Sequence, residues 1–152
     1  MFTRAVSSAA TVVLLAVVSA LLFVWAMRGA GNRPKWLELL TYAVAYLAPA
    51  GLVVTTLAIP LASTRLYLDG ISVDQEFRTE YLGRSATSPG LPDMAYADLP
   101  TYYPGGWFWL GGRMANVLGL PGWEVFQPWA LVTLSAAASL LVPVWQRLSG
   151  SL

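Results

Sequence analysis

The densest group of charged side chains in the sequence lies in residues 71–84, ISVDQEFRTEYLGR. It contains Asp74, Glu76, Arg78, Glu80 and Arg84. One interpretation is chemical, because a carboxylate held near a membrane is able to act as general base toward a hydroxyl nucleophile. The other is structural, because Asp74 with Arg78 and Glu80 with Arg84 have the i, i+4 spacing of surface ion pairs on a solvated helix. Spacing alone does not decide between them.

A short helix is predicted to carry these carboxylates. Ser72 opens an S-x-x-Q capping box, so the helix is expected to begin there. Asp74 then takes the second helical position, where free N–H groups and the helix dipole stabilise a carboxylate. Phe77 and Tyr81 follow each other at i, i+4 and predict one aromatic face for docking. Gly83 is predicted to end the helix.

The composition is typical of a membrane protein. Of 152 residues, 57% are hydrophobic and 11% are charged, whereas about 25% are charged in an ordinary soluble domain. The net charge of +1 and the dispersed basic residues argue against nucleic acid as a partner. The chain has no cysteine and no histidine, which excludes disulfides, Cys or His zinc sites, and catalysis by a His base or Cys nucleophile.

Three apolar stretches are predicted to be transmembrane helices: residues 5–27, 37–63 and 125–145. The first is about 23 residues long, enough at about 1.5 Å per residue to cross about 30 Å of hydrocarbon. Residues 28–35 form a short loop with three basic residues and no acid, which marks the cytoplasmic side. Residues 65–122 are therefore expected to form one long external loop. The predicted fold is an all-α membrane protein with short helices in this loop.

Prolines, glycines and aromatics give further predictions. Pro49 should kink the second span, whereas Pro128 is expected in the first turn of the third, where proline is tolerated. The run TYYPGGWFW, residues 101–109, is typical of an aromatic belt at the membrane interface. Residues 107–118 are predicted to form a short interfacial helix. Arg113 could bind a lipid phosphate or extend toward the headgroups, and these two interpretations stay open.

Three segments resemble a known family: LYLDGISVDQEFRTEYLGR at 66–84, LPDMAYADLPTYYPGGWFWLGGR at 91–113, and WEVFQPWA at 123–130. They are similar to the N-terminal membrane region of the actinobacterial arabinofuranosyltransferases that act on galactan, which are polytopic glycosyltransferases of the GT-C type. The resemblance implies that residues 1–152 are the N-terminal membrane domain of such an enzyme. It also implies that the fragment alone is inactive, because the rest of the enzyme is absent.

The same resemblance implies a reaction and its residues. The donor would be decaprenylphosphoryl arabinose, the acceptor a galactan hydroxyl in arabinogalactan synthesis, and the site would open to the periplasmic side of the plasma membrane. The role of base falls on Asp74, with Glu76 and Asp69 as alternatives. The substrate-binding candidates are Arg78, Arg113, Tyr103 and Trp107. No metal site is predicted, and a requirement for a divalent cation stays open.

A second hypothesis belongs to a different class of protein. The chain would be a non-catalytic membrane accessory or assembly subunit. Its external loop would then dock a partner through Phe77, Tyr81 and the aromatic run at residues 101–109.

Overall fold

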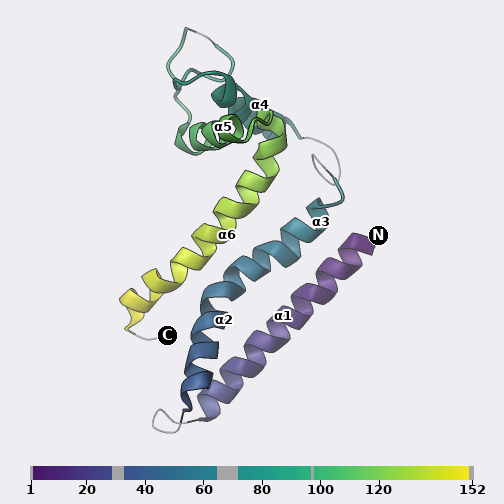
Figure 1. Ribbon diagram of the computed structural model, residues 1–152, viewed down its shortest axis with the longest axis vertical. Helices are drawn as coiled ribbons and strands as arrows, with labels where there is room; N and C mark the ends of the chain where they lie inside the picture. The colour runs from purple at the N-terminus through teal and green to yellow at the C-terminus, as the bar shows by residue number, and fades with distance from the viewer. Residues whose placement is uncertain (1, 29–32, 65–71, 97, 151–152) are drawn as a thin grey trace. The chain divides into compact units, whose positions relative to one another are not determined.

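The computed structural model describes residues 2–28, 33–64, 72–96 and 98–150, and its regular structure there is helical. The helices are α1 Phe2–Met27, α2 Lys35–Val53, the π-helix η2 Val54–Ala58, α3 Ile59–Leu61, α4 Val73–Thr87, α5 Gly106–Leu118 and α6 Gly122–Ser149 (Figure 1). Across the described residues the only β pairing is an isolated bridge between Pro92 and Pro100. The predicted all-α fold is confirmed.

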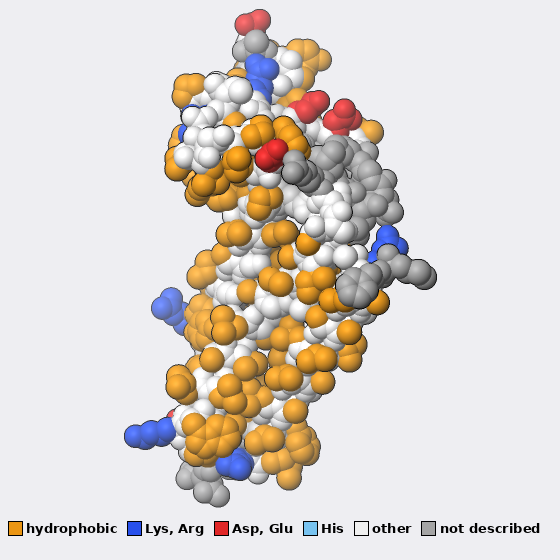
Figure 2. Space-filling view, turned by 45° about the vertical axis from the view of Figure 1, so that its right-hand side comes forward, with side chains coloured by type: hydrophobic (Ala, Val, Ile, Leu, Met, Phe, Trp, Pro, Cys, Tyr) orange, Lys and Arg blue, Asp and Glu red, His pale blue; other side chains and the backbone are white. Residues whose placement is uncertain are grey.

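Three helical segments are long and apolar enough to cross a membrane: Thr3–Met27, Lys35–Leu61 and Gly122–Ser149. The second is continuous through α2, η2 and α3. Hydrophobic side chains cover much of the surface of the long helices in Figure 2. Such a surface suits lipid, and most of the backbone hydrogen bonds of each helix are made within its own segment.

The second span is irregular next to its prolines. Pro49 lies inside α2, and the ribbon bends along this helix as predicted (Figure 1). η2 precedes Pro60, whose ring would clash with the carbonyl group four residues earlier in a regular α-helix. The Thr55 carbonyl has two possible backbone donors in this stretch, the N–H groups of residues 59 and 60. The N–H of Ile59 donates to the Val54 carbonyl instead, and Pro60 has no N–H. The Thr55 carbonyl therefore has no helical donor. The Ser7 hydroxyl of α1 donates to that carbonyl at 2.5 Å.

The chain divides into two compact units, each described by itself. The span unit comprises residues 1–63 and 131–152, and the loop unit comprises residues 64–130. Within the span unit, α1 packs against α2, η2 and α3. The Tyr46 hydroxyl of α2 donates to the Gln146 side-chain oxygen at 2.8 Å.

The loop unit is built around α4 and α5. Its core contains Tyr81, Leu82, Phe108 and Phe126, each of which is nearly inaccessible to solvent. Burying a side chain of this size contributes about 1.5–3 kcal/mol. Gly112 brings α5 against the backbone of α4, because a Cβ at this position would overlap the main chain of Ser85.

Two predictions about glycine and proline are wrong. α4 does not end at Gly83 but continues to Thr87. Gly83 instead lies where α6 begins, since a Cβ on Gly122 would stand 2.5 Å from the Gly83 Cα. α6 starts at Gly122, so Pro128 is in its second turn and not its first. The missing N–H of Pro128 removes the helical hydrogen bond to the Glu124 carbonyl.

Candidate functional site

The start of α4 was predicted correctly, although its side-chain cap is absent. Ser72 is the N-cap residue with extended backbone, φ −81° and ψ 162°. Its carbonyl accepts from the N–H groups of Gln75 at 3.0 Å and Glu76 at 2.9 Å. The Ser72 side chain makes no capping hydrogen bond. By position, the N–H groups of Val73 and Asp74 have no carbonyl partner within the helix, and the helix dipole favours a carboxylate at this end.

The carboxylates of α4 are accessible. Asp74, Glu76 and Glu80 are exposed, and Arg78 is half-buried. Within the described part of the chain, neither Asp74 with Arg78 nor Glu80 with Arg84 forms an ion pair. The i, i+4 spacing of these residues therefore does not produce the surface ion pairs that one interpretation of the sequence predicted.

Helical periodicity divides these carboxylates between two faces. Asp74 precedes Phe77 and Tyr81 on the side that packs against the rest of the loop unit. Tyr103 reaches the same side, with its ring 5.2 Å from Phe77 in an edge-to-face arrangement. Glu76 lies on another face, one helical turn before Glu80. The structure thus brings Tyr103, but not Glu76, to the Asp74 side of α4.

Part of the aromatic run belongs to the core, because Phe108 is buried, whereas Tyr102 is 84% exposed. Tyr81 is 1% exposed and stacks on Phe108, with their ring centroids 4.8 Å apart. Trp107 packs edge-on against Phe126 at 5.8 Å, and its carbonyl accepts from the Trp129 indole at 3.2 Å. Tyr103 remains 43% exposed. Of the two predicted aromatic substrate contacts, Tyr103 is accessible and Trp107 is half-buried within the core.

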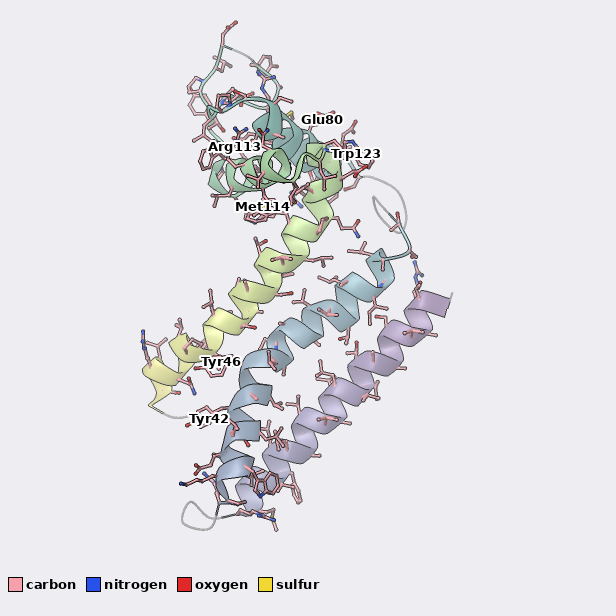
Figure 3. All side chains as sticks on the ribbon, in the orientation of Figure 1. Tyr42, Tyr46, Glu80, Arg113, Met114 and Trp123 are labelled. Atoms are coloured by element: carbon pink, nitrogen blue, oxygen red, sulfur yellow. The ribbon has the colours of Figure 1, made fainter. Side chains whose placement is uncertain are left out.

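Arg113 binds the far end of α4. The guanidinium of Arg113, which is labelled in Figure 3, donates to the carbonyl of Ser88 at 2.9 Å and also to those of Ser85 and Ala86. These are carbonyls at the C-terminal end of the helix, where a cation is favourable. Twelve residues separate Asp74 from Ala86, which corresponds to about 18 Å along a helix axis. Arg113 and Asp74 therefore do not face one small reacting group, and Asp69 lies outside the described residues.

A groove of about 510 Å³ opens on the opposite side of α4 from Tyr103, and sequence reasoning did not identify it. We call it the α4–α6 groove. Its walls include Thr79, Glu80, Thr87, Asn116 and Trp123. Of its lining residues, sequence reasoning had noted only Glu80 for its chemistry. The others are brought together by the contact of Gly83 with Gly122, which links segments distant in the sequence.

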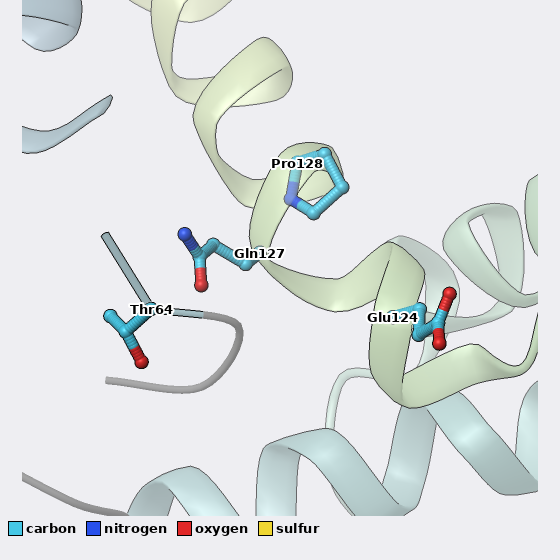
Figure 4. Close-up of a pocket in the computed structure, with 4 residues that line it drawn as sticks. All are labelled: Thr64, Glu124, Gln127 and Pro128. Carbon is cyan, nitrogen blue, oxygen red and sulfur yellow. The ribbon is translucent and has the colours of Figure 1, made fainter. Parts of the chain in front are cut away.

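A second pocket, of about 280 Å³, lies at the start of α6 (Figure 4). It is lined by Thr64, Glu124, Gln127 and Pro128. Glu124 is half-buried in the first turn of its helix, and sequence reasoning did not single it out. In the described segments no group of three or more acidic side chains is close enough to hold a metal ion.

Comparison with known proteins covers the whole chain. A family described as "Arabinofuranosyltransferase N terminal" matches residues 1–152. The galactan 5-O-arabinofuranosyltransferase of Corynebacterium glutamicum is 58% identical over 99% of this chain and 24% of its own length. Enzymes of the same name from Mycolicibacterium smegmatis and Mycobacterium tuberculosis are 55% and 52% identical over 60% and 62% of the chain, and 15% of their own lengths.

The chain thus spans about a quarter, or less, of the curated relatives that it matches. The family match covers residues 1–152 and therefore includes α4 and the whole of the loop unit. The resemblance drawn from three sequence segments is confirmed over the full length: the chain belongs to the arabinofuranosyltransferase N-terminal family.

Proposed function

We propose that this chain is the N-terminal membrane part of an enzyme that transfers arabinofuranose from decaprenylphosphoryl arabinose to a galactan hydroxyl during arabinogalactan synthesis. The observation that carries the proposal is the family match over all 152 residues. The chain also has exposed carboxylates on α4, which lies in the sequence between two apolar spans. The relatives are named as galactan 5-O-arabinofuranosyltransferases, which supplies the sugar and the acceptor.

The proposed reaction is one inverting displacement with Asp74 as base. The Asp74 carboxylate takes the proton of the galactan hydroxyl as its oxygen attacks the anomeric carbon of arabinose. The new C–O bond forms as the bond to the lipid phosphate breaks, and the phosphate leaves with the electron pair. Asp74 suits the role because its carboxylate is exposed and lies in the first turn of α4. Glu76 and Asp69 remain the alternatives.

The departing phosphate needs a cationic partner near Asp74. Arg78 is half-buried one helical turn further on, and among the described residues it forms no ion pair with Asp74. It is therefore the proposed phosphate contact. Tyr103, exposed beside the same face, is the proposed sugar contact, whereas Trp107 and Arg113 hold the site together through the core and the end of α4.

One premise of the accessory-subunit hypothesis conflicts with the packing of the loop unit. It required Phe77 and Tyr81 to present a free aromatic face, but the Tyr81 ring stacks on Phe108 inside the loop unit. A partner would have to displace α5 to reach it. The enzyme hypothesis needs no such rearrangement.

The test is Asp74→Asn in the full-length enzyme, assayed with a lipid-linked arabinose donor and a galactan acceptor. Loss of the base should lower the rate by about 10²–10⁴-fold. Glu76→Gln separates the two candidate bases, because it removes a neighbouring exposed carboxylate from another face. With Asp74 as the base its rate should stay near wild type, and with Glu76 as the base its rate should fall instead. A wild-type rate for Asp74→Asn would exclude it as the base. Absence of any transfer by the wild-type full-length protein would favour the accessory role.

A further inference from the structure

The α4–α6 groove is a fixed feature of the loop unit. Gly83 and Gly122 bring the two helices almost into backbone contact, so no side chain separates them. Trp123 follows Gly122 directly and is held beside the outer face of α4. Its indole is 41% exposed although it lines the groove. The volume of about 510 Å³ lies within the about 300–1,000 Å³ typical of small-molecule sites.

The polar side chains of the groove offer mainly acceptor oxygens. The hydroxyl of Thr79 donates to the Gln75 carbonyl at 2.7 Å, and that of Thr87 to the Arg84 carbonyl at 3.0 Å. Their oxygen lone pairs remain available. The Asn116 amide nitrogen donates to the Ala86 carbonyl, which leaves its side-chain oxygen as an acceptor. Glu80 adds an exposed carboxylate.

This chemistry selects one class of ligand. A ring that offers several hydroxyl donors on its edge and C–H groups on one face fits acceptor oxygens beside an exposed indole. A phosphate does not fit, because the charged side chain of the groove is the Glu80 carboxylate and it would repel an anion. The ligand is therefore a neutral sugar and not the lipid-linked donor.

We propose that the α4–α6 groove is an acceptor subsite that holds one neutral sugar residue of the glycan chain. The apolar face of the sugar lies on Trp123, and its hydroxyls donate to Glu80 and to the threonine oxygens. This inference rests on the proposed function, because it takes the glycan to be the acceptor of the transfer. Glu80 is six residues from Asp74, or about 9 Å along the helix axis and on another face. The subsite thus holds a sugar residue other than the one that reacts.

The position of the subsite predicts how its loss affects the reaction. Contacts to a remote sugar are made equally in the ground state and the transition state, so their loss raises KM and leaves kcat unchanged. Glu80→Gln and Trp123→Ala should each raise KM by about tenfold for a long galactan acceptor. The same variants should leave KM unchanged for an acceptor too short to reach the groove. Trp123→Phe keeps an aromatic face and should recover most of the affinity.

The experiment uses the full-length enzyme in detergent, with galactan oligosaccharides of increasing length. Activity gives KM and kcat, and isothermal titration gives the affinity without donor. Glu38→Gln and Trp145→Ala are matched controls, because both residues are exposed and lie in the span unit. Thermal unfolding identifies a variant that fails to fold, and in that case Glu80→Gln and Trp123→Phe decide the outcome.

Four outcomes are distinguishable. A length-dependent rise in KM for Glu80→Gln and Trp123→Ala supports the subsite. Unchanged KM and affinity for long acceptors, in an enzyme whose wild type transfers arabinose, overturns the subsite and leaves the proposed function intact. A wild type that binds no galactan oligosaccharide and transfers no arabinose overturns both. An affinity that follows anionic lipid content and not acceptor length would assign the groove to lipid headgroups and overturn the sugar proposal.

Discussion

At the scale of single residues, the main lesson concerns the two arginines proposed to contact substrate. Their types alone do not distinguish them, because both could bind a phosphate bidentately. The structure separates them by their partners. Arg113 donates to carbonyls at the end of α4, and part of its guanidinium is buried. Arg78 is half-buried one turn from Asp74. Under the proposed mechanism, Arg78 is therefore the arginine expected to assist the departure of a phosphate from a sugar held at Asp74.

This difference is testable by replacing each arginine with methionine in the full-length enzyme. Arg113→Met should lower the free energy of unfolding by about 2 kcal/mol, because it leaves buried carbonyls without their charged donor. Its KM for the donor should stay near wild type. Arg78→Met should slow transfer with little effect on stability. The measurements are thermal unfolding in detergent and donor kinetics; a raised donor KM with normal unfolding in Arg113→Met would reverse the assignment.

At the scale of helices, the sequence predicted which segments are helical better than what their glycines do. Hydropathy and length indicated the three spans, and Ser72 indicated the start of α4. Gly83 was predicted to end α4, and Gly111 and Gly112 fall within the helix predicted at residues 107–118. All three positions lie inside helices. Their purpose is close packing, which depends on residues distant in the sequence. A single sequence therefore does not distinguish a packing glycine from a terminating one.

The packing role of Gly112 predicts a large difference between two glycines of the same helix. A Cβ at Gly112 would meet the backbone of α4, whereas one at Gly106 would find open space. Gly112→Ala should lower the free energy of unfolding by about 1–3 kcal/mol through overpacking. Gly106→Ala should be neutral or slightly stabilising, because alanine favours the helix. Thermal unfolding of the two variants compares them directly, and equal midpoints would contradict the close approach of α5 to α4.

The π-helix gives a second prediction at this scale. Ser7→Ala should destabilise the span unit by about 1 kcal/mol, because the Thr55 carbonyl then has no donor within hydrocarbon. Pro60→Ala supplies a new backbone N–H that can serve this stretch. In that background, Ser7→Ala should cost less. A double-mutant cycle monitored by thermal unfolding in detergent measures the difference, and strict additivity would show that Ser7 and Pro60 are unrelated.

At the scale of the whole molecule, the sequence predicted the candidate site only in part. The carboxylates of α4 were evident because they are adjacent in the chain. The α4–α6 groove was not evident, since Trp123 and Asn116 reach Glu80 only through tertiary packing. The side of the membrane on which the loop unit lies is a prediction from the basic residues at 28–35 and stays one.

The proposed topology can be measured because this chain has no cysteine. In a full-length enzyme stripped of any further cysteine, Ser88→Cys should react with a membrane-impermeant thiol reagent in intact cells. Ser149→Cys, the matched substitution at the last residue of α6, should react only after the membrane is permeabilised. The opposite pattern would invert the topology and exclude a site open to the periplasm.

Helix α6 contributes residues to both the loop unit and the span unit, and this affects how the protein folds during synthesis. Phe126 closes the core of the loop unit, yet it belongs to the helix that continues into the third span. During synthesis, α4 and α5 emerge before this helix and expose the rings of Tyr81 and Phe108 until it arrives. Completion of the loop unit therefore requires the helix that also forms the third span, and a ribosome that stalls between residues 118 and 126 would leave a hydrophobic surface available to chaperones and proteases.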